Sequence, residues 1–268
     1  MSKYDYQVLF FPGKKLPAAE LSELVAELQN VAAKCFCEVP RYQALSGQKH
    51  ELDRAVMCLA RDQNGNLVGF CSALALPIAG HGSVLHLGLT CVHPDARGQN
   101  LTHHLTSKML LNYLLRQAPF KGTWISNCAC VLSSLGNVAM YFESLYPSPY
   151  GIKQPSQKHI RIAKSISEQH RQPIAINAEA QFDLQRFVFA GSINGTVFEK
   201  DGDDERFHHR DDALTGYYQD LLNFDNGDEA LQIGRVSLMT FPKYILRKGW
   251  NKFKQIVPKP RKSPNYAS

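Results

Sequence analysis

The sequence lacks any apolar run long enough to cross a bilayer, and its start lacks the charged-then-apolar pattern of a secretory signal. The early stretch 7–11, Gln-Val-Leu-Phe-Phe, is too short for either and predicts a first strand. Internal repeats and low-complexity tracts are also missing. These absences exclude the membrane-spanning and secreted classes, so we expect a globular protein of the cytoplasm.

The sequence also lacks the Cys-x-x-Cys spacing of a zinc knuckle. Its seven cysteines include two Cys-x-Cys pairs, Cys35–Cys37 and Cys128–Cys130, and most lie inside apolar runs. Reduced cysteines serve there as small apolar side chains. The histidine pairs 103–104 and 208–209 have no third ligand at a fixed spacing. We therefore expect no disulfide and no metal.

Acidic residues are absent after Glu229, where nine lysines and arginines occur. The net charge of +6 therefore arises in the C-terminal part. Between Lys243 and Lys262, apolar and basic residues alternate at nearly helical spacing. We expect this segment to pack its apolar face on its own domain, but contact with nucleic acid or an anionic membrane stays open.

The 268 residues can form one large domain or two small ones, and 44% of them are hydrophobic. Apolar periodicity predicts, in this order, strand 4–11, helix 18–36, strands 55–60, 67–76 and 84–92, helix 101–116, strand 122–132 and helix 135–145. The turn Asp62-Gln-Asn-Gly65-Asn predicts a hairpin between the second and third strands. Further along, the pattern predicts helix 157–170, an apolar element 182–190, a charged loop 201–212, helix 213–222 and strand 230–241.

The stretch from His86 to Leu115 holds the strongest functional signal. It predicts a buried strand, a turn with Gly98 and the start of a helix. Such a junction gathers unpaired backbone N–H groups at the positive end of a helix dipole, which suits a phosphate. Arg97 adds a positive charge, and Gly98 lets a ligand approach the backbone closely.

The order Val92-x-Pro94-x-x-Arg97-Gly98-x-x-Leu101 resembles the acetyl-CoA loop of the GNAT superfamily of N-acetyltransferases. That family's loop reads Gln/Arg-x-x-Gly-x-Gly/Ala, often with an extra Gly after the Arg. Arg97 and Gly98 match it, whereas Asn100 stands in place of the first Gly and Thr102 in place of the closing Gly/Ala. Asn tolerates a positive φ better than most residues, so the loop can still form.

A second motif, Ser134-Leu-Gly-Asn-Val-Ala-Met-Tyr141-Phe-Glu-Ser-Leu145, resembles the helix that follows the family's fifth strand. Tyr141 falls at the family's tyrosine, and Ser134 stands where Asn is usual. Ser134 is also our predicted N-cap for this helix. The closing Gly-Phe of the family pattern is lost near Tyr146.

The resemblance implies an α/β protein with a central, mixed, mostly antiparallel sheet that splays between two parallel strands and is flanked by helices. Residues 1–147 would form the acyl-CoA-binding core, and residues 148–242 an enlarged part that completes the sheet with insertions. Residues 243–268 would form a basic amphipathic tail. Residues 37–53 and the enlarged part would shape the acceptor pocket.

The resemblance also implies acetyl-CoA as the donor in acetyl transfer to a primary amine within a ternary complex. Its expected contacts are Leu89, Thr90, Cys91, Val92, Arg97, Gly98, Gln99, Asn100, Leu101, Thr102 and Ser134. The strand segment 89–92 would pair with the pantetheine amides, residues 97–102 would hold the pyrophosphate, and a backbone N–H near Leu89 would polarise the thioester carbonyl.

Tyr141 is our candidate for protonating the departing thiolate, because a phenol is a neutral donor at pH 7. His86 is the candidate base, since it lies on the central strand where some members carry a glutamate. Either residue can instead be an ordinary core residue. Cys128 and Cys130 invite an acyl-cysteine route, but no base stands at a fixed spacing, and packing is the favoured interpretation.

Two interpretations of the whole chain stay open: an N-acetyltransferase, or a non-catalytic acyl-CoA-binding or regulatory protein on a degenerate scaffold of the same kind. For the enzyme we expect a small-molecule amine rather than a protein lysine as the acceptor. The sequence does not identify that amine, the acyl chain length or the oligomeric state.

Overall fold

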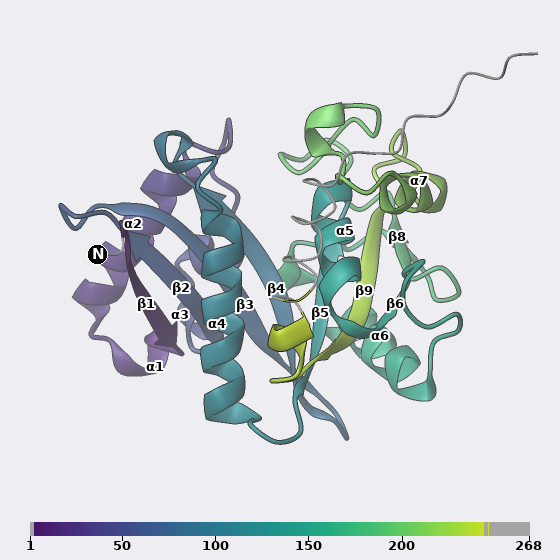
Figure 1. Ribbon diagram of the computed structural model, residues 1–268, viewed down its shortest axis with the longest axis horizontal. Coiled ribbons are helices and arrows are strands. Elements are labelled where there is room, and N and C mark those ends of the chain that lie inside the picture. The colour runs from purple at the N-terminus through teal and green to yellow at the C-terminus, as the bar shows by residue number, and fades with distance from the viewer. Residues whose placement is uncertain (1–2, 244–245, 247–268) are drawn as a thin grey trace, which may run out of the picture.

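The computed structural model describes residues 3–243 and residue 246, and the predicted basic tail lies outside this range except for Lys243 and Leu246. One nine-stranded sheet runs through the described chain (Figure 1). Its strands are β1 (Asp5–Phe10), β2 (Ala55–Arg61), β3 (Leu67–Ile78), β4 (Gly82–Val92), β5 (Thr123–Ala129), β6 (Glu143–Tyr146), β7 (Gln181–Asp183), β8 (Val188–Ala190) and β9 (Glu229–Val236). Its order is β1-β2-β3-β4-β5-β9-β8-β7, with β6 also paired to β9.

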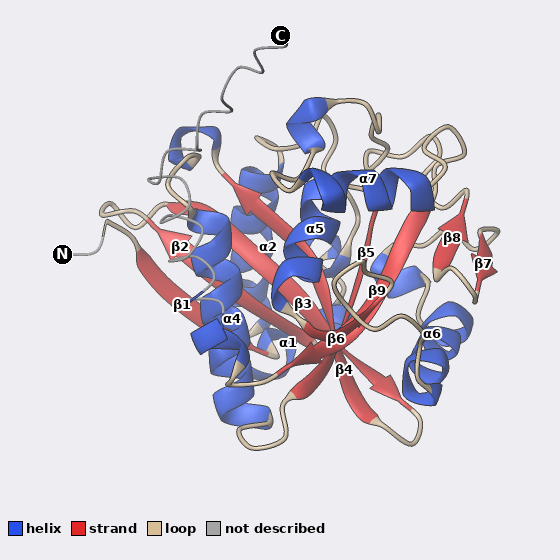
Figure 2. Ribbon diagram, turned by 45° about the vertical axis from the view of Figure 1, so that its right-hand side comes forward, coloured by secondary structure: helices blue, strands red, loops and turns tan. Residues whose placement is uncertain are grey.

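Helices cover both faces of this sheet (Figure 2). The α-helices are α1 (Pro12–Lys15), α2 (Ala18–Ala32), α3 (Lys49–Leu52), α4 (Leu101–Gln117), α5 (Leu132–Tyr141), α6 (Gln157–Gln169) and α7 (Asp212–Leu221). Short 3-10 helices are η1 (Gln43–Ser46), η2 (Pro94–Ala96), η3 (Gln172–Ile174) and η4 (Glu205–Phe207).

Two buried clusters explain this layering. The apolar faces of α4, α5 and α7 share one cluster, with Leu105, Leu135 and Leu214 fully buried in it. The apolar faces of α2 and α6 belong to the other cluster, which includes Leu28 and Ile162. Because successive strand residues point to opposite faces, the buried strands supply both clusters.

All strand pairs are antiparallel except β4 and β5. These two run parallel and pair only from Val84–Trp124 to Leu87–Asn127. Past that point β5 stays paired with β9 as far as Ala129, while β4 stays paired with β3 as far as Val92. The sheet therefore splays between its two parallel strands, as the sequence predicted.

The enlarged half of the chain is built into the same sheet. β9 lies beside β5, and its other edge pairs first with β8 at Ala230 and then with β6 at Ile233 and Arg235. Two strand segments thus share one edge of β9, and the chain between them carries α6, η3 and β7. A further insertion between β8 and β9 carries η4 and α7.

Several predicted boundaries are wrong. The predicted helix 135–145 starts earlier, at Leu132, and ends at Tyr141, because residues 143–146 pair with β9 as β6. Its N-cap is Val131, so the predicted capping role of Ser134 is also wrong. The apolar element 182–190 forms two strands, β7 and β8, and the strand predicted over 230–241 ends at Val236.

All seven cysteines are free thiols. Within the described residues, no helix is both long and apolar enough to cross a membrane.

Candidate functional site

The gap between β4 and β5 begins at a bulge in β4. Cys71 of β3 pairs with Thr90 and Ala73 pairs with Leu87, so Gly88 and Leu89 together face Ser72. On their other side, the pairing with β5 has already ended at Leu87. The backbone of Gly88 and Leu89 is therefore free of a strand partner on the side of β5, which leaves it accessible to an extended ligand.

Gly88 is required by the close approach of Gln43. A Cβ at position 88 would overlap the Gln43 side-chain oxygen and lie 2.8 Å from Ser72 Oγ. The Gln43 amide donates to the Tyr42 hydroxyl at 2.9 Å, and Ser72 donates to Gln43 at 3.1 Å. This chain of polar side chains fixes η1 against the bulge, on the face of the sheet that carries α2.

The start of α4 is an open turn with two residues in the left-handed conformation. Gly98 has φ +75° and Asn100 has φ +62°, and no side chain caps the helix. An added Cβ at Gly98 would meet nothing within 4 Å. The first N–H groups of an uncapped helix have no partner within that helix, so residues 97–102, here called the α4 loop, can direct them at a ligand phosphate.

Two hydrogen bonds anchor the α4 loop to its surroundings, and a third group shares one of their acceptors. Tyr4 donates a hydrogen bond to the Gln99 side-chain oxygen at 2.8 Å, and Arg97 Nε donates to the Val92 carbonyl oxygen at 3.4 Å. The Cys35 thiol lies at the same carbonyl oxygen, also at 3.4 Å. Hydrogen bonding from Cys91 and the nearby Arg97 charge hold the pKa of Cys35 below its usual value.

A cavity of about 420 Å³ runs through the gap between the two strands. On the α4 and α5 face its lining includes Thr102, Thr106, Ser134, Tyr141 and Phe241. On the α2 face its lining includes Phe36, Tyr42, Ile174, Phe198 and Glu229. The cavity therefore joins both faces of the sheet at the point where β4 and β5 separate, so two ligands can meet there from opposite sides.

The predicted site residues divide into three groups. Leu89, Thr90, Thr102, Ser134 and Tyr141 line the cavity. Arg97, Gly98, Gln99 and Asn100 surround the start of α4, outside the lining of the cavity. Cys91, Val92 and Leu101 are buried, so only their backbone is available to a ligand.

Tyr141 lies at the C-terminal end of α5. Its hydroxyl oxygen accepts a hydrogen bond from Arg210 at 3.0 Å, and its ring meets the His103 ring edge-on at 6.5 Å. Arg210 comes from the insertion before α7, which packs against α5. The insertion thus orients the predicted acid, a role that no local sequence pattern indicated.

His86 is fully buried and lies outside the lining of the cavity. Its Nδ1 is 2.9 Å from Ser126 Oγ, and its buried Nε2 has no hydrogen-bond partner among the residues that the structure describes. Burial, together with the charge of His170, lowers the pKa of His86 to about 3. These properties describe a neutral core histidine, and the geometry does not support the predicted role as base.

Glu229 is a cavity residue that sequence reasoning missed. It begins β9, is 8% exposed, and accepts a hydrogen bond from Ser192 Oγ at 2.6 Å. Burial raises the pKa of Glu229 to about 7. The only signal in the sequence was its place as the last acidic residue. Its approach to the gap depends on the pairing of β9 with β5, more than 90 residues away.

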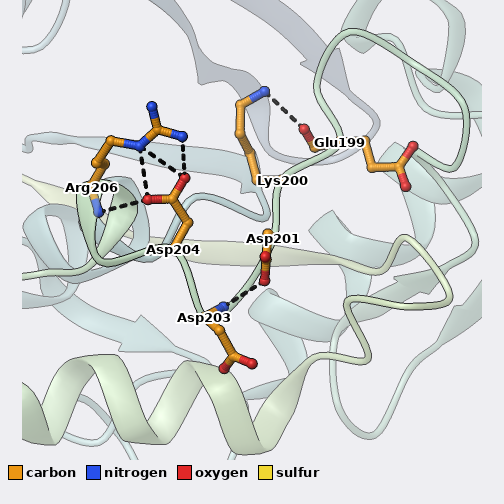
Figure 3. Close-up of polar contacts among 6 residues, drawn as sticks. All are labelled: Glu199, Lys200, Asp201, Asp203, Asp204 and Arg206. Atoms are coloured by element: carbon orange, nitrogen blue, oxygen red, sulfur yellow. Dashed lines mark hydrogen bonds and ion pairs between the residues drawn. The ribbon is translucent and has the colours of Figure 1, made fainter.

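Lys200 also lines the cavity, but its ammonium group is engaged by its own loop. It donates to the carbonyl oxygens of Val197 at 3.2 Å and Glu199 at 2.8 Å (Figure 3). The next residues of this loop are held by Asp201, which accepts from the Asp203 N–H, and by the Asp204–Arg206 ion pair. Within residues 3–243, no group of three or more histidines, cysteines and acidic residues is placed to hold a metal ion.

The comparisons with known proteins give structures only, because no protein-family model and no curated protein matches this sequence. Ribosomal-protein-alanine N-acetyltransferase from Brucella melitensis biovar Abortus 2308 is 22% identical, with a TM-score of 0.30, over 44% of this chain and 75% of that one. The GNAT family N-acetyltransferase YhbS from Escherichia coli, in complex with CoA, is 15% identical, with a TM-score of 0.34, over 47% of this chain and 63% of that one. ElaA from Escherichia coli is 19% identical, with a TM-score of 0.35, over 51% of this chain and 81% of that one.

Two of these three structures are named N-acetyltransferases, and one of the two is described as a GNAT family member. This chain has the mostly antiparallel sheet, the separating parallel pair and the flanking helices that the resemblance implied. All three matches lie below a TM-score of 0.5, so the description of the fold rests on the topology of this chain's own sheet.

Proposed function

We propose that this protein is an N-acetyltransferase that takes acetyl-CoA as its donor and passes the acetyl group directly to a primary amine. The observation that carries this proposal is the cavity through the gap between β4 and β5, which joins Thr102, in the first turn of α4, on one face to Glu229 on the other. A donor and an acceptor can enter from opposite faces and meet without an intermediate carrier.

The donor's diphosphate fits the α4 loop, because the space before Gly98 is open and the helix start has no cap. Arg97 supplies a positive charge beside this site. The pantetheine arm fits the free backbone of Gly88 and Leu89 as an added strand. A main-chain N–H near Leu89 would then lie close to the thioester carbonyl and polarise it.

Tyr141 is the proposed proton donor to the departing thiolate. Its oxygen accepts a hydrogen bond from Arg210, which holds the hydroxyl group at the C-terminal end of α5 beside the cavity. Arg210 is a positioning residue in this scheme. His86 receives no role, since it is buried, uncharged and outside the cavity lining.

The proposal does not use an acyl-cysteine. Burial raises the pKa of Cys128, and burial and then the Glu229 charge raise that of Cys130 to about 12. Both side chains are therefore neutral thiols near pH 7, and a thiol is a weak nucleophile. Direct attack by the amine on the donor predicts that both substrates must be bound together, so initial-rate plots should intersect and not run parallel.

The acceptor is proposed to be a small molecule. Its side of the cavity is walled by residues from separate parts of the chain, namely Phe36, Tyr42, Ile174 and Phe198. A pocket enclosed in this way suits a whole small ligand better than a side chain on a folded protein.

Replacement of Tyr141 by Phe tests the proposed function. We expect acetyl-CoA to bind with a Kd within about threefold of the unmodified protein, because the phenol contributes to proton transfer and little to binding. Amine-dependent thiol release should fall about 100-fold, the usual worth of one acid catalyst. Calorimetry measures the binding, and a thiol reagent measures the release.

Tyr6 on the edge strand β1 provides the control, because Tyr6→Phe makes the same change far along the sheet order from the gap. It should alter neither measurement. Failure of the unmodified protein to bind acetyl-CoA would contradict the proposal. Tight binding without turnover across a broad amine screen would instead support the non-catalytic acyl-CoA-binding alternative.

A further inference from the structure

Glu229 is a buried carboxylate with only part of its hydrogen-bonding capacity used. Ser192 donates to one oxygen, and within the described part of the chain no lysine, arginine or histidine forms an ion pair with it. Lys200, the other charged residue of the lining, is turned to the carbonyl oxygens of its loop. A buried carboxylate is costly unless a cation joins it, and the cavity is the place from which a cation can come.

The walls around Glu229 are aromatic and apolar. The Tyr42 ring meets the Phe198 ring edge-on at 5.7 Å, and Phe198 meets Phe36 in the same way at 6.2 Å. Glu229 lines the same cavity as Phe36, Tyr42 and Phe198. One negative charge beside aromatic faces suits an ammonium group on an apolar body.

We propose that Glu229 binds the ammonium group of the acceptor and takes its proton, and that the wall of Phe36, Tyr42 and Phe198 selects amines with a single charge and an apolar body. This inference rests on the proposed acetyl transfer. It fills the role of base that His86 cannot perform, because Glu229 lies in the cavity on the face opposite Tyr141.

The proton and electron balance is complete with the two substrates and two side chains. Glu229 accepts one proton from R–NH3⁺, and the neutral nitrogen forms a bond to the thioester carbon. The C–S bond breaks with its electron pair on sulfur, and Tyr141 gives that sulfur a proton. The second proton of the nitrogen replaces the one that Tyr141 gave, and Glu229 releases its own proton to water.

The first experiment compares Glu229→Gln with Glu179→Gln, the same change at an exposed carboxylate of the enlarged half. The readout is kcat/KM for 2-phenylethylamine, followed by thiol release from pH 5.5 to 9. We expect Glu229→Gln to lower kcat/KM at least 100-fold and to remove the fall in activity below about pH 7. Glu179→Gln should leave both unchanged.

The second experiment tests selectivity with the unmodified protein. The kcat/KM for 2-phenylethylamine should exceed that for 1,4-diaminobutane at least 30-fold, because the second ammonium of the diamine would enter an apolar wall. Phe198→Ala should narrow this ratio at least fivefold. Equal kcat/KM values for the two amines would contradict the proposed selectivity. An unchanged pH profile in Glu229→Gln would contradict the role of Glu229 as the base.

Acetyl-CoA binding separates this inference from the proposed function. If Glu229→Gln binds acetyl-CoA normally and keeps its rate with 2-phenylethylamine, only the role of Glu229 is lost. If the unmodified protein does not bind acetyl-CoA, the proposed function fails as well. Glu229→Asp separates a loss of the base from a folding defect, because it keeps a carboxylate at this position. Its kcat/KM should be at least tenfold higher than that of Glu229→Gln.

Discussion

At the scale of single residues, Asn100 illustrates a local property that the sequence predicts well. The family loop has Gly at this position, and an asparagine there raises the question of whether the loop can form. Asn100 adopts φ +62°, a left-handed conformation that asparagine reaches more readily than most residues. The open helix start that we assign to the donor's diphosphate therefore survives the substitution.

The two candidate bases differ in a way that only their surroundings explain. His86 and Glu229 are both buried, and burial disfavours the charged form of each: it lowers the pKa of His86 to about 3 and raises that of Glu229 to about 7. A histidine shifted in this way no longer changes charge near neutral pH, whereas the glutamate does. The residue expected from type alone is thus the less suitable one.

Stability against pH provides a test of the Glu229 environment. Because its pKa of about 7 in the folded protein exceeds the ordinary glutamate pKa of about 4.5, the folded state holds more protons than the unfolded state between these pH values. The contribution of Glu229 to stability is therefore complete below about pH 4.5 and is lost as the pH rises through about 7. The loss amounts to about 3 kcal/mol at 1.36 kcal/mol per pKa unit.

Glu229→Gln removes this loss. The difference in free energy of unfolding, variant minus unmodified protein, should rise by about 3 kcal/mol between pH 4.5 and pH 8. Urea unfolding at several pH values measures it, and His86, which shifts in the opposite direction, is present in both proteins and cancels. Parallel stability curves would show that Glu229 titrates as an exposed carboxylate does.

At the scale of elements, α5 shows why the second motif predicted a helix but not its end. The helix stops at Tyr141 because Glu143 and Tyr146 join β9, a strand that begins more than 80 residues later. The helix start at Leu132 likewise follows closely on the end of β5, and its N-cap residue Val131 provides no capping side chain. Long-range pairing overrides the local helical signal here.

Gly136 in α5 explains how closely the insertion before α7 can approach this helix. An added Cβ would lie 2.5 Å from the His209 ring, whose side chain is itself 5% exposed. The same insertion carries Arg210 to Tyr141. Glycine is unfavourable inside a helix, but Gly136 permits the close packing of the insertion that orients Tyr141, the proposed acid.

Gly136→Ala should lower the free energy of unfolding by about 1–3 kcal/mol, because overlap with His209 outweighs the better helix propensity of alanine. Gly216→Ala in α7 is the matched control, since a Cβ there meets nothing within 4 Å. It should raise stability by about 0.5–1 kcal/mol. Denaturant unfolding measures both, and a stabilised Gly136→Ala would mean that His209 moves aside freely.

At the scale of the whole molecule, one buried hydrogen-bond network ties the two halves together beside the gap. Gln232 of β9 accepts from Asn127 at 2.9 Å and donates to the Leu135 carbonyl oxygen at 3.1 Å and to the Tyr218 hydroxyl at 2.6 Å. Tyr218 donates onward to the Pro147 carbonyl oxygen at 3.1 Å. Strands β5 and β9 and helices α5 and α7 are thereby fixed where β5 leaves β4.

Gln232→Met keeps a similar side-chain length but removes every hydrogen bond of this amide. We expect a loss of about 2–4 kcal/mol in the free energy of unfolding, because Asn127 and the Leu135 carbonyl are left buried without this partner. Acetyl-CoA binding should weaken as well, since the network borders the gap. Gln154→Met, at an exposed loop position, should change stability by less than about 0.5 kcal/mol.

The sequence by itself determined the properties that depend on neighbouring residues. Turn chemistry predicted the hairpin of β2 and β3, apolar periodicity predicted α4, and the resemblance of residues 92–102 predicted the loop at its start. Its prediction of a sheet that splays between two parallel strands is also confirmed. These features could be predicted because local propensity and the pattern of burial favour the same structure.

Only the tertiary structure decided which distant residues share the cavity. Glu229 and Phe198 line it, and Arg210 contacts Tyr141, because β9 pairs with β5 and because the insertions fold over α5 and along the α2 face. No spacing in the chain encodes such contacts, since the pairing partner of a strand is selected by the burial of whole faces. Burial keeps His86 uncharged near neutral pH, and burial also raises the pKa of Glu229 to about 7. Burial of either side chain is a property of the assembled sheet.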